Sequence, residues 1–285
     1  MRDTVDKHMI NKTIYSIFKR GSKTYYYSTL FFPKNVKHDV FILYSFLRKA
    51  DDYVDQIPQD SDGFNQFRDR YYAAKEGEVT NDLVVDSFVK LADRKNFDDK
   101  WVDSFLSSMA MDITFSTYEN MDELLNYLYG SSEVVGLFMA RIMDLSKESF
   151  YAARYLGRSM QYINFIRDIA EDFELGRTYF PQVDLEYFNL ANLGEEQARI
   201  NPEGFKGLVR KQLNTYQSWQ LKAEKGFKHI PYRYLIPIKT ASDLYKWTAH
   251  QIEKDPFVVY QKKIKPSIPK IVSNVLSNSI RLGIN

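Results

Sequence analysis

Residues 161–176, QYINFIRDIAEDFELG, carry polar side chains that cluster on one side of a predicted helix. At about 100° per residue, one arc of about 80° holds Gln161, Asn164, Asp168 and Asp172, with Glu171 at its edge. The other sides of the helix are mainly apolar, as is typical of a buried helix. We therefore expect these carboxylates to face a cavity and not bulk water.

A second acid-rich stretch lies far upstream, in RKADDYVD. Its charged residues follow one another at i, i+3, i+4 and i+7 as Arg48, Asp51, Asp52 and Asp55. The same helical face continues toward the N-terminus as an apolar stripe of Val40, Tyr44 and Leu47. A solvated surface would place its carboxylates opposite such a stripe, so this stretch also favours a cavity.

Both acidic clusters come late in their predicted helices, just before Pro58 and Gly176. The negative end of the helix dipole disfavours anions there, and like charges four residues apart repel. Mg²⁺ is the natural compensating cation, because it binds one or two carboxylates and completes its shell with water and phosphate oxygens. A single DxxxD pattern is usually a solvated face or a set of salt bridges, here with Arg48 and Lys49. Two such clusters favour a shared metal and diphosphate site.

The residues of both clusters resemble the squalene and phytoene synthase family. The two aspartate-rich motifs of that family are matched by DDYVD at 51–55 and by Asn164, Arg167, Asp168, Glu171 and Asp172. The resemblance extends to SKTY at 22–25, YGSSEVVG at 129–136, GRTYFP at 176–181 and PFVVY at 256–260, and so covers most of the chain. One departure is Glu133, where many members have Gly in an AGTVG run.

The resemblance implies an all-α fold, the isoprenoid synthase helical bundle around a central cavity, and head-to-head condensation of two prenyl diphosphates. The metal would be Mg²⁺, with Mn²⁺ as an alternative, held among Asp51, Asp52, Asp55, Asn164, Asp168, Glu171 and Asp172. The residues expected in catalysis are Asp51, Asp55, Asp168, Asp172, Arg48 and Tyr44. Those expected to bind substrate are Ser22, Lys23, Thr24, Arg48, Tyr129, Gln161, Asn164, Arg167 and Tyr245.

Within this family, residues 129–139 and 238–260 look more like microbial phytoene synthases than squalene synthases. This favours the conversion of two geranylgeranyl diphosphates to phytoene through prephytoene diphosphate. No NADPH is expected, because this ending needs no hydride, and the chain contains no GxGxxG cluster. The alternatives are squalene or dehydrosqualene synthesis from farnesyl diphosphate and, in a different class, a non-catalytic prenyl-lipid binding protein.

Composition limits the other possibilities. The 285 residues contain no Pro-, Gly- or Ser-rich linker, so we predict a single domain over residues 1–285. A formal charge of +2 without a lysine-rich run argues against nucleic acid. The lack of cysteine excludes thiolate metal sites, and the lack of a signal sequence or an 18-residue apolar run predicts a cytoplasmic protein. Residues 230–237 could contact lipid or a partner, although a buried turn is the more frequent explanation. The basic run 261–265 is usually a solvated end and could instead meet anionic headgroups or diphosphate. Peripheral membrane contact and the oligomeric state therefore stay open.

Apolar periodicity predicts about ten helices. They are expected in the first 20 residues, from Pro33 through the first motif, and over residues 64–75, 82–93, 101–117, 121–145, 149–176, 204–228 and 235–253, the last substantial helix. Residues 182–201 show no clear period. Asp112 is expected either to be paired within the core or to line the cavity. The small residues between Gly130 and Gly136 favour a ligand channel over close helix packing.

Overall fold

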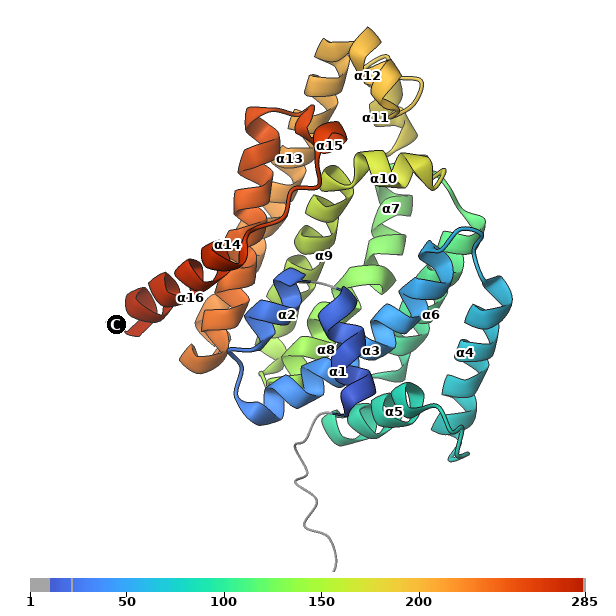
Figure 1. The fold of residues 1–285 in the computed structure, drawn as a ribbon, viewed down its shortest axis with the longest axis vertical. Helices are drawn as coiled ribbons and strands as arrows, with labels where there is room; N and C mark the ends of the chain where they lie inside the picture. The colour runs from blue at the N-terminus through green and yellow to red at the C-terminus, as the bar shows by residue number, and fades with distance from the viewer. Residues whose placement is uncertain (1–10, 22, 284–285) are drawn as a thin grey trace, which may run out of the picture.

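The computed structural model describes residues 11–21 and 23–283, without the side chains of residues 23–25. Within these ranges every regular element is helical, and the β-type pairing consists of an isolated bridge between Tyr118 and Pro181. The described residues form sixteen α-helices, which pack into one bundle (Figure 1). The all-α prediction is confirmed. The expected number of about ten helices is too low, because several helices are too short to show an apolar period.

The N-terminal half contains the helix of the first acidic motif and the helices that support it. Its α-helices are α1 (Lys12–Gly21), α2 (Lys23–Thr29), α3 (Lys34–Asp55), α4 (Ser61–Lys75), α5 (Leu83–Lys95), α6 (Asp99–Thr114), α7 (Met121–Leu128) and α8 (Val134–Ile142). The helix of the first motif, α3, starts directly after Pro33, as predicted. Asp60, Asp82 and Asp98 cap the three helices that follow by accepting hydrogen bonds from their first free N–H groups.

The C-terminal half contains the second motif and a last helix that was not among the expected ones. Its α-helices are α9 (Phe150–Arg167), α10 (Ile169–Glu174), α11 (Gln182–Tyr187), α12 (Glu195–Ile200), α13 (Pro202–Glu224), α14 (Tyr232–Lys254), α15 (Val258–Gln261) and α16 (Ile268–Gly283). Residues 235–253 are therefore not the last substantial helix. Pro269 lies in the first turn of α16, where proline removes no hydrogen bond that the helix needs. Residues 182–201 form two short helices, and not a continuous irregular connection.

The predicted helix over residues 121–145 is interrupted by a π-helical turn at Tyr129–Glu133. Its small residues allow neighbouring backbones to come close. A Cβ on Gly130 would lie 2.0 Å from the carbonyl oxygen of Ser104, and one on Gly136 would lie 2.1 Å from that of Ala153. Close packing therefore requires both glycines, and Ser131, Ser132 and Gly136 also line the cavity described below. The small residues serve both helix packing and the cavity, so neither explanation excludes the other.

The predicted helix of the second motif breaks at Asp168. This residue has φ −100° and ψ 16°, and it separates α9 from α10. Figure 1 shows α10 turning away from the axis of α9. Glu171 and Asp172 consequently lie in the first turn of a new short helix and not at the end of a long one. The prediction that the acids lie at the negative end of a helix dipole therefore holds for the first motif and for Asp168, the C-cap of α9, and is wrong for Glu171 and Asp172.

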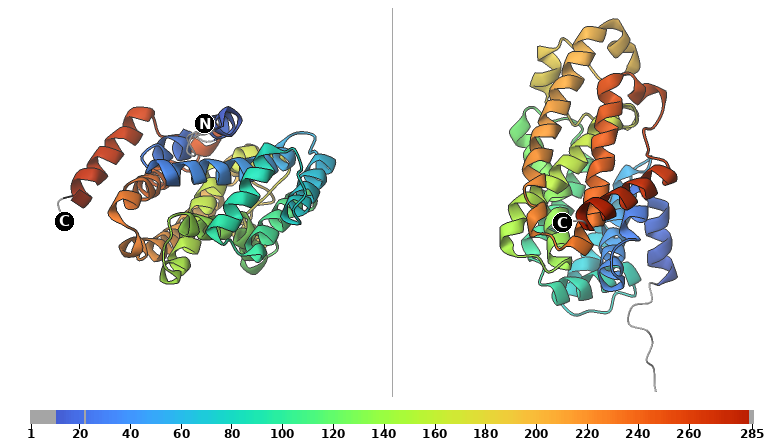
Figure 2. Two further views of the ribbon diagram at one scale, coloured as in Figure 1. Left: turned by 90° about the horizontal axis from the view of Figure 1, so that it is seen from below. Right: turned by 90° about the vertical axis from the view of Figure 1, so that its left-hand side faces the viewer.

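Two hydrophobic clusters form the core. The first gathers mainly residues of α1, α3–α6 and α8, among them Phe41, Phe46 and Phe88. The second gathers residues of α7 and α9–α15, among them Tyr162 and Phe205. Figure 2 shows the helices of the two halves packed beside one another. One cavity is lined by side chains of both clusters, so the predicted central cavity is confirmed. Whether both clusters belong to a single domain stays a prediction.

Candidate active site

A cavity of about 750 Å³ occupies the centre of the bundle. Apolar and aromatic side chains cover much of its wall, including Val40, Leu47, Phe105, Met109, Met139, Met160 and Phe165. Polar residues of both acidic motifs line the same cavity: Arg48, Asp51, Asp55, Gln161, Asn164, Arg167, Asp168, Glu171 and Asp172. The structure thus brings together two motifs that are more than 100 residues apart in the sequence.

The first motif contributes two of its three acids to the cavity. Asp51 and Asp55 line it, together with Tyr44 and Arg48 of the preceding turns. Asp52 points elsewhere. Its carboxylate is largely exposed and lies 2.6 Å from the guanidinium of Arg48. Asp52 is therefore separated from the metal-ligand set to which the sequence assigned it.

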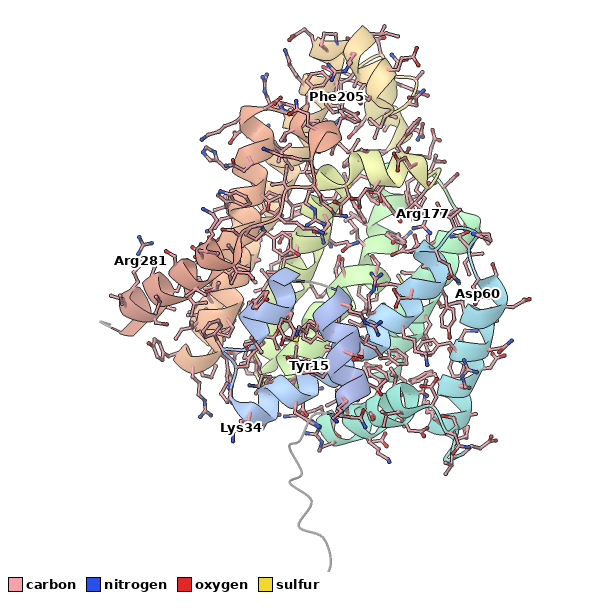
Figure 3. The ribbon with its side chains drawn as sticks, viewed as in Figure 1. Tyr15, Lys34, Asp60, Arg177, Phe205 and Arg281 are labelled. Carbon is pink, nitrogen blue, oxygen red and sulfur yellow. The ribbon has the colours of Figure 1, made fainter. Side chains whose placement is uncertain are left out.

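Arg177 provides a cation at the C-terminus of α3 that the sequence analysis did not single out. Its buried guanidinium donates to Asp55 Oδ1 at 2.9 Å and to the carbonyl oxygen of Val54. Figure 3 labels Arg177 near the end of α10. A protein side chain therefore compensates the negative end of this helix, a role that we had assigned to a metal ion. The position of Arg177 directly after Gly176 in the GRTYFP run was the available signal.

Two cations neutralise part of the negative charge of the second motif. Arg167 donates to the neighbouring Asp168 through Nε at 2.8 Å. Lys263, from the basic run after α15, pairs with Glu171 and lies 3.7 Å from Asp168. Lys265 also lines the cavity, and burial followed by the nearby charge of Lys263 lowers its pKa. The basic run is therefore part of the cavity wall and not only a solvated end.

Asp51 and Asp172 are the acids of the two motifs without an ion pair to a cation in the described part of the chain. Burial, and then the nearby charge of Asp55, raise the pKa of Asp51 to about 8. Burial, and then the charge of Asp168, raise the pKa of Asp172 well above its usual value. Each helix thus presents one carboxylate that its own protein surroundings do not neutralise.

The donor set fits a hard divalent cation. Besides the two uncompensated carboxylates, Asn164 has a buried Oδ1 without a hydrogen-bond partner among the described residues. No group of three or more acidic, His or Cys side chains stands close enough to hold a metal by itself within residues 11–21 and 23–283. This arrangement is compatible with Mg²⁺, which is often bound by one or two carboxylates, water and substrate phosphates.

A network of tyrosines surrounds Asp112 at the cavity wall. The hydroxyls of Tyr127 and Tyr179 donate to its two carboxylate oxygens at 2.9 and 3.0 Å. Burial raises the pKa of Asp112 to about 6, and the charge of Arg177 opposes this increase. Both expectations for Asp112 are therefore met, because it is paired within the core and lines the cavity. The two tyrosines were not predicted, since no local pattern links them to this aspartate.

The remaining predicted residues fall into three groups. Tyr245 lines the cavity, whereas Tyr129 lies outside it, with its ring 5.1 Å from the guanidinium carbon of Arg154. Ser22 lies outside the described residues, and so do the side chains of Lys23 and Thr24.

Glu133, the departure from the family pattern, does not face the cavity. It is 1% exposed and accepts hydrogen bonds from Arg154 at 2.7 Å and Arg158 at 2.6 Å. Both arginines belong to α9, so the buried carboxylate ties the π-helical turn to the helix of the second motif. The departure therefore lies in a contact between helices and outside the residues that line the cavity.

The sequence comparisons identify the family. A family model described as Squalene/phytoene synthase matches residues 18–271, which is most of the chain. The protein therefore belongs to the squalene/phytoene synthase family and is a head-to-head prenyltransferase. The 15-cis-phytoene synthase of Pantoea ananas is 25% identical over 273 residues, covering 91% of this chain and 87% of that protein. The 15-cis-phytoene synthase of Synechocystis is 26% identical over 265 residues, covering 87% of this chain and 78% of that protein.

Solved structures confirm the isoprenoid synthase fold. A dehydrosqualene synthase in complex with a ligand superposes with a TM-score of 0.84 at 23% identity, over 96% of both chains. A squalene synthase of Alicyclobacillus acidocaldarius gives a TM-score of 0.77 at 19% identity, over 86% of this chain and 94% of that one. No helix in the part of our chain that the structure describes is long and apolar enough to span a membrane.

Proposed function

We propose that this protein condenses two geranylgeranyl diphosphates to phytoene through prephytoene diphosphate in a Mg²⁺-dependent reaction, without NADPH. The observation that carries the proposal is the pair of uncompensated carboxylates, Asp51 and Asp172, on two different helices of one largely apolar cavity. The choice of phytoene rests on the resemblance to proteins named phytoene synthases. It does not rest on the cavity dimensions.

The polar end of the cavity would hold the diphosphates. Asp51 and Asp172, together with Asn164 Oδ1 from the same cavity wall, would hold Mg²⁺ or, as the alternative ion, Mn²⁺. The bound ion would neutralise the diphosphate and make it a better leaving group. Arg48 and Lys265 line the same end and would bind phosphate oxygens as donors.

The apolar part of the cavity would protect the cationic intermediates. Its side chains exclude water, which reacts with an allylic cation. The aromatic rings of Tyr127 and Phe165 line the wall and would stabilise positive charge through their faces. Asp112 would hold the hydroxyls of Tyr127 and Tyr179 in place, so that these rings keep their orientation.

Product analysis with two competing substrates tests the proposal. The purified protein is incubated with Mg²⁺ and both farnesyl and geranylgeranyl diphosphate, without NADPH, and the extracted hydrocarbons are analysed by mass spectrometry. We expect a C40 hydrocarbon with the central double bond of phytoene. A C30 product would assign the chain to the farnesyl diphosphate branch. Accumulation of the cyclopropyl diphosphate until NADPH is added would point to a squalene-type ending.

Pyrophosphate release separates an enzyme from a binding protein. A non-catalytic prenyl-lipid binding protein would bind the diphosphate and release no pyrophosphate with Mg²⁺. The matched control is the pair Asp51→Asn and Asp52→Asn, because these neighbours differ in whether they line the cavity. We expect the first variant to lose pyrophosphate release and the second to keep most of it.

A further inference from the structure

The C-terminal helix α16 exposes an unusual number of apolar side chains. One face packs onto the bundle through Ile271 and Val275, which are nearly fully buried. A second face carries large apolar residues at every fourth position that are between 42% and 62% exposed, namely Ile268, Val272, Leu276 and Ile280. Helical geometry places them side by side. The apolar sector of α16 is thus wider than its contact with the bundle requires.

The segments next to α16 extend this exposed apolar area. The helix packs against α14 and α2. Tyr232, at the start of α14, is half exposed, and its hydroxyl donates to the carbonyl oxygen of Ser279 at 3.0 Å. Leu30 and Phe31, directly after α2, are also exposed. We call this set the α16 surface: Leu30, Phe31, Tyr232, Ile268, Val272, Leu276 and Ile280. In Figure 2, α16 lies at the outer edge of the bundle, across α14.

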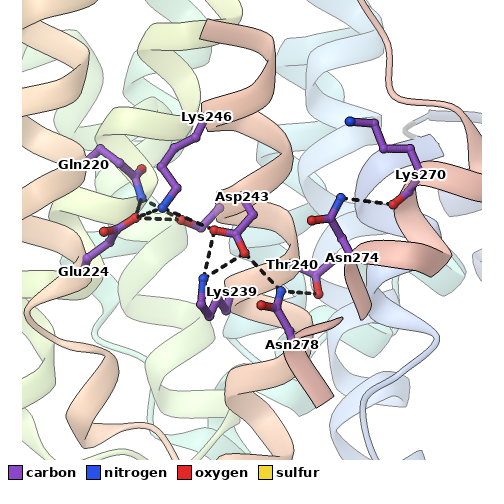
Figure 4. A network of polar contacts seen from close by, with 10 residues as sticks. Gln220, Glu224, Lys239, Thr240, Asp243, Lys246, Lys270, Asn274 and Asn278 are labelled. Carbon is purple, nitrogen blue, oxygen red and sulfur yellow. Dashed lines mark hydrogen bonds and ion pairs between the residues drawn. The ribbon is translucent and has the colours of Figure 1, made fainter. Parts of the chain in front are cut away.

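Polar contacts fix the orientation of α16. Asn278 is buried and donates to Thr240 Oγ1 at 3.2 Å and to Asp243 Oδ2 at 3.1 Å. Asp243 in turn pairs with Lys239 and Lys246 on its own helix, and Figure 4 shows this network. Because the buried amide has these specific partners, α16 cannot rotate its exposed face inward without losing them. The apolar face is therefore held outward.

Charge is strongly segregated around the α16 surface. The chain as a whole is nearly neutral, at +2. The three segments that contribute to this surface nevertheless contain no Asp or Glu: residues 11–38 carry six Lys and Arg, residues 225–242 carry four, and residues 256–285 carry five. Among these cations, Lys263 and Lys265 line the cavity and Lys239 pairs with Asp243, so the others remain for this side of the molecule. Figure 3 shows two of these cations, Lys34 and Arg281, at the periphery on the side of α16. An apolar face is thus combined with an exclusively basic set of segments.

We infer that the α16 surface docks the protein onto a bilayer that contains anionic lipids. An amphipathic helix inserts its apolar side chains at the level of the headgroups, and nearby Lys and Arg side chains attract anionic headgroups. A second copy of the chain is the less suitable occupant, because two copies of this face would bring like charges together. Docking would explain why the seven large hydrophobic residues of the α16 surface are exposed in the free protein, since a bilayer would cover them.

The position of the surface also suits the proposed reaction. Thr29 of α2 and Ile238 of α14 line the cavity. The same two segments contribute Leu30, Phe31 and Tyr232 to the α16 surface. The bilayer would thus lie one helical layer from the cavity. This step alone rests on the proposed function, since a C40 hydrocarbon is insoluble in water and needs a lipid phase to receive it.

Vesicle flotation with the purified full-length protein tests the inference. Vesicles of phosphatidylcholine are compared with vesicles that also contain phosphatidylglycerol, and we expect the protein to float mainly with the second kind. The combined variant Val272→Ser, Leu276→Ser and Ile280→Ser should bind at least tenfold more weakly. The variant Lys34→Gln, Arg233→Gln and Arg281→Gln should lose about fivefold per charge on anionic vesicles.

A control variant with the same residue types checks that the effect is local. Val79, Leu221 and Ile200 lie outside the α16 surface and are between 64% and 80% exposed. Their replacement by Ser should leave flotation unchanged. Failure of the unaltered protein to bind anionic vesicles would overturn the inference. A dimer that the α16 variant converts to a monomer, with no change in flotation, would identify a second copy as the occupant.

Flotation does not depend on turnover, so the two proposals can fail separately. A protein that binds anionic vesicles but makes no hydrocarbon would contradict the proposed function and support the docking surface. A protein that makes phytoene but does not bind anionic vesicles would support the proposed function and contradict the docking surface.

Discussion

The two acidic motifs face the same cavity but are built differently. The first lies on one unbroken helix, α3, and is neutralised from a distant part of the chain by Arg177. The second lies across a helix break at Asp168 and is neutralised by the adjacent Arg167 and by Lys263 from the C-terminal region. In each motif the protein neutralises some acids and leaves one carboxylate, Asp51 or Asp172, without a cation. The two motifs therefore differ in how their acids are neutralised, but each offers one carboxylate without a cation to a ligand in the cavity.

The largest expected effect is the loss of turnover when one of the two acids without an ion pair is replaced. Asp51→Asn and Asp172→Asn should each reduce turnover by about 100-fold to 1,000-fold, by analogy with the loss of a preorganised electrostatic group. Without metal, both variants should be as stable as the parent protein or slightly more so, because they remove a buried carboxyl group whose raised pKa shows that folding disfavours its ionised form. Steady-state kinetics and thermal melts in EDTA measure both effects. Clear destabilisation without metal would mean that these acids form structural ion pairs.

The next prediction compares the cations of the two motifs. Arg177→Gln should lower the free energy of unfolding by about 3 kcal/mol, because it leaves Asp55 and the carbonyl of Val54 without their shared donor. Arg167→Gln should cost less stability, since Lys263 remains near Asp168. Urea unfolding of the metal-free proteins measures the difference. Equal losses would show that the two motifs are stabilised alike.

Ligand binding should couple the two motifs. Mg²⁺ alone should raise the melting temperature only slightly, because no complete cluster of acids exists in the described part of the chain. Mg²⁺ with a non-reactive geranylgeranyl thiodiphosphate should stabilise by about 2.7 kcal/mol at a hundredfold excess over Kd. Differential scanning fluorimetry compares the two conditions. Equal shifts with and without the diphosphate would contradict a site shared between the motifs.

The smallest expected effect is a pH dependence of metal-free stability. The folded protein binds the Asp51 proton up to about pH 8, whereas an unfolded chain releases it near pH 4. Between these values the folded state binds more protons, so the free energy of unfolding falls as the pH rises. Melting temperatures in EDTA should therefore fall by several degrees from pH 5 to pH 8, and Asp51→Asn should reduce this slope. An unchanged slope in the variant would show that other groups cause it.

The sequence predicted the helical class because apolar spacing is a local property. The same spacing placed Tyr44, Arg48, Asp51 and Asp55 on one face of α3, and all four line the cavity. Gln161, Asn164, Asp168, Glu171 and Asp172 also reach the cavity, although the helix that was expected to carry them breaks. The short helices were missed because two turns show no period. The helix α16 was also missed, although Ile268, Val272, Leu276 and Ile280 recur at every fourth position, so the local signal for it was present in the sequence.

The sequence alone therefore determined which residues could do the chemistry, since residue type and helical spacing are written in it. Only the tertiary structure decided which acids stay without a partner. Asp52 pairs with Arg48 and does not itself line the cavity, and Arg177 reaches Asp55 across 122 positions of sequence. Such pairs depend on how α3, α9 and the C-terminal segment pack against one another. A charge is neutralised by what lies near it in space, and one sequence without its fold does not contain those distances.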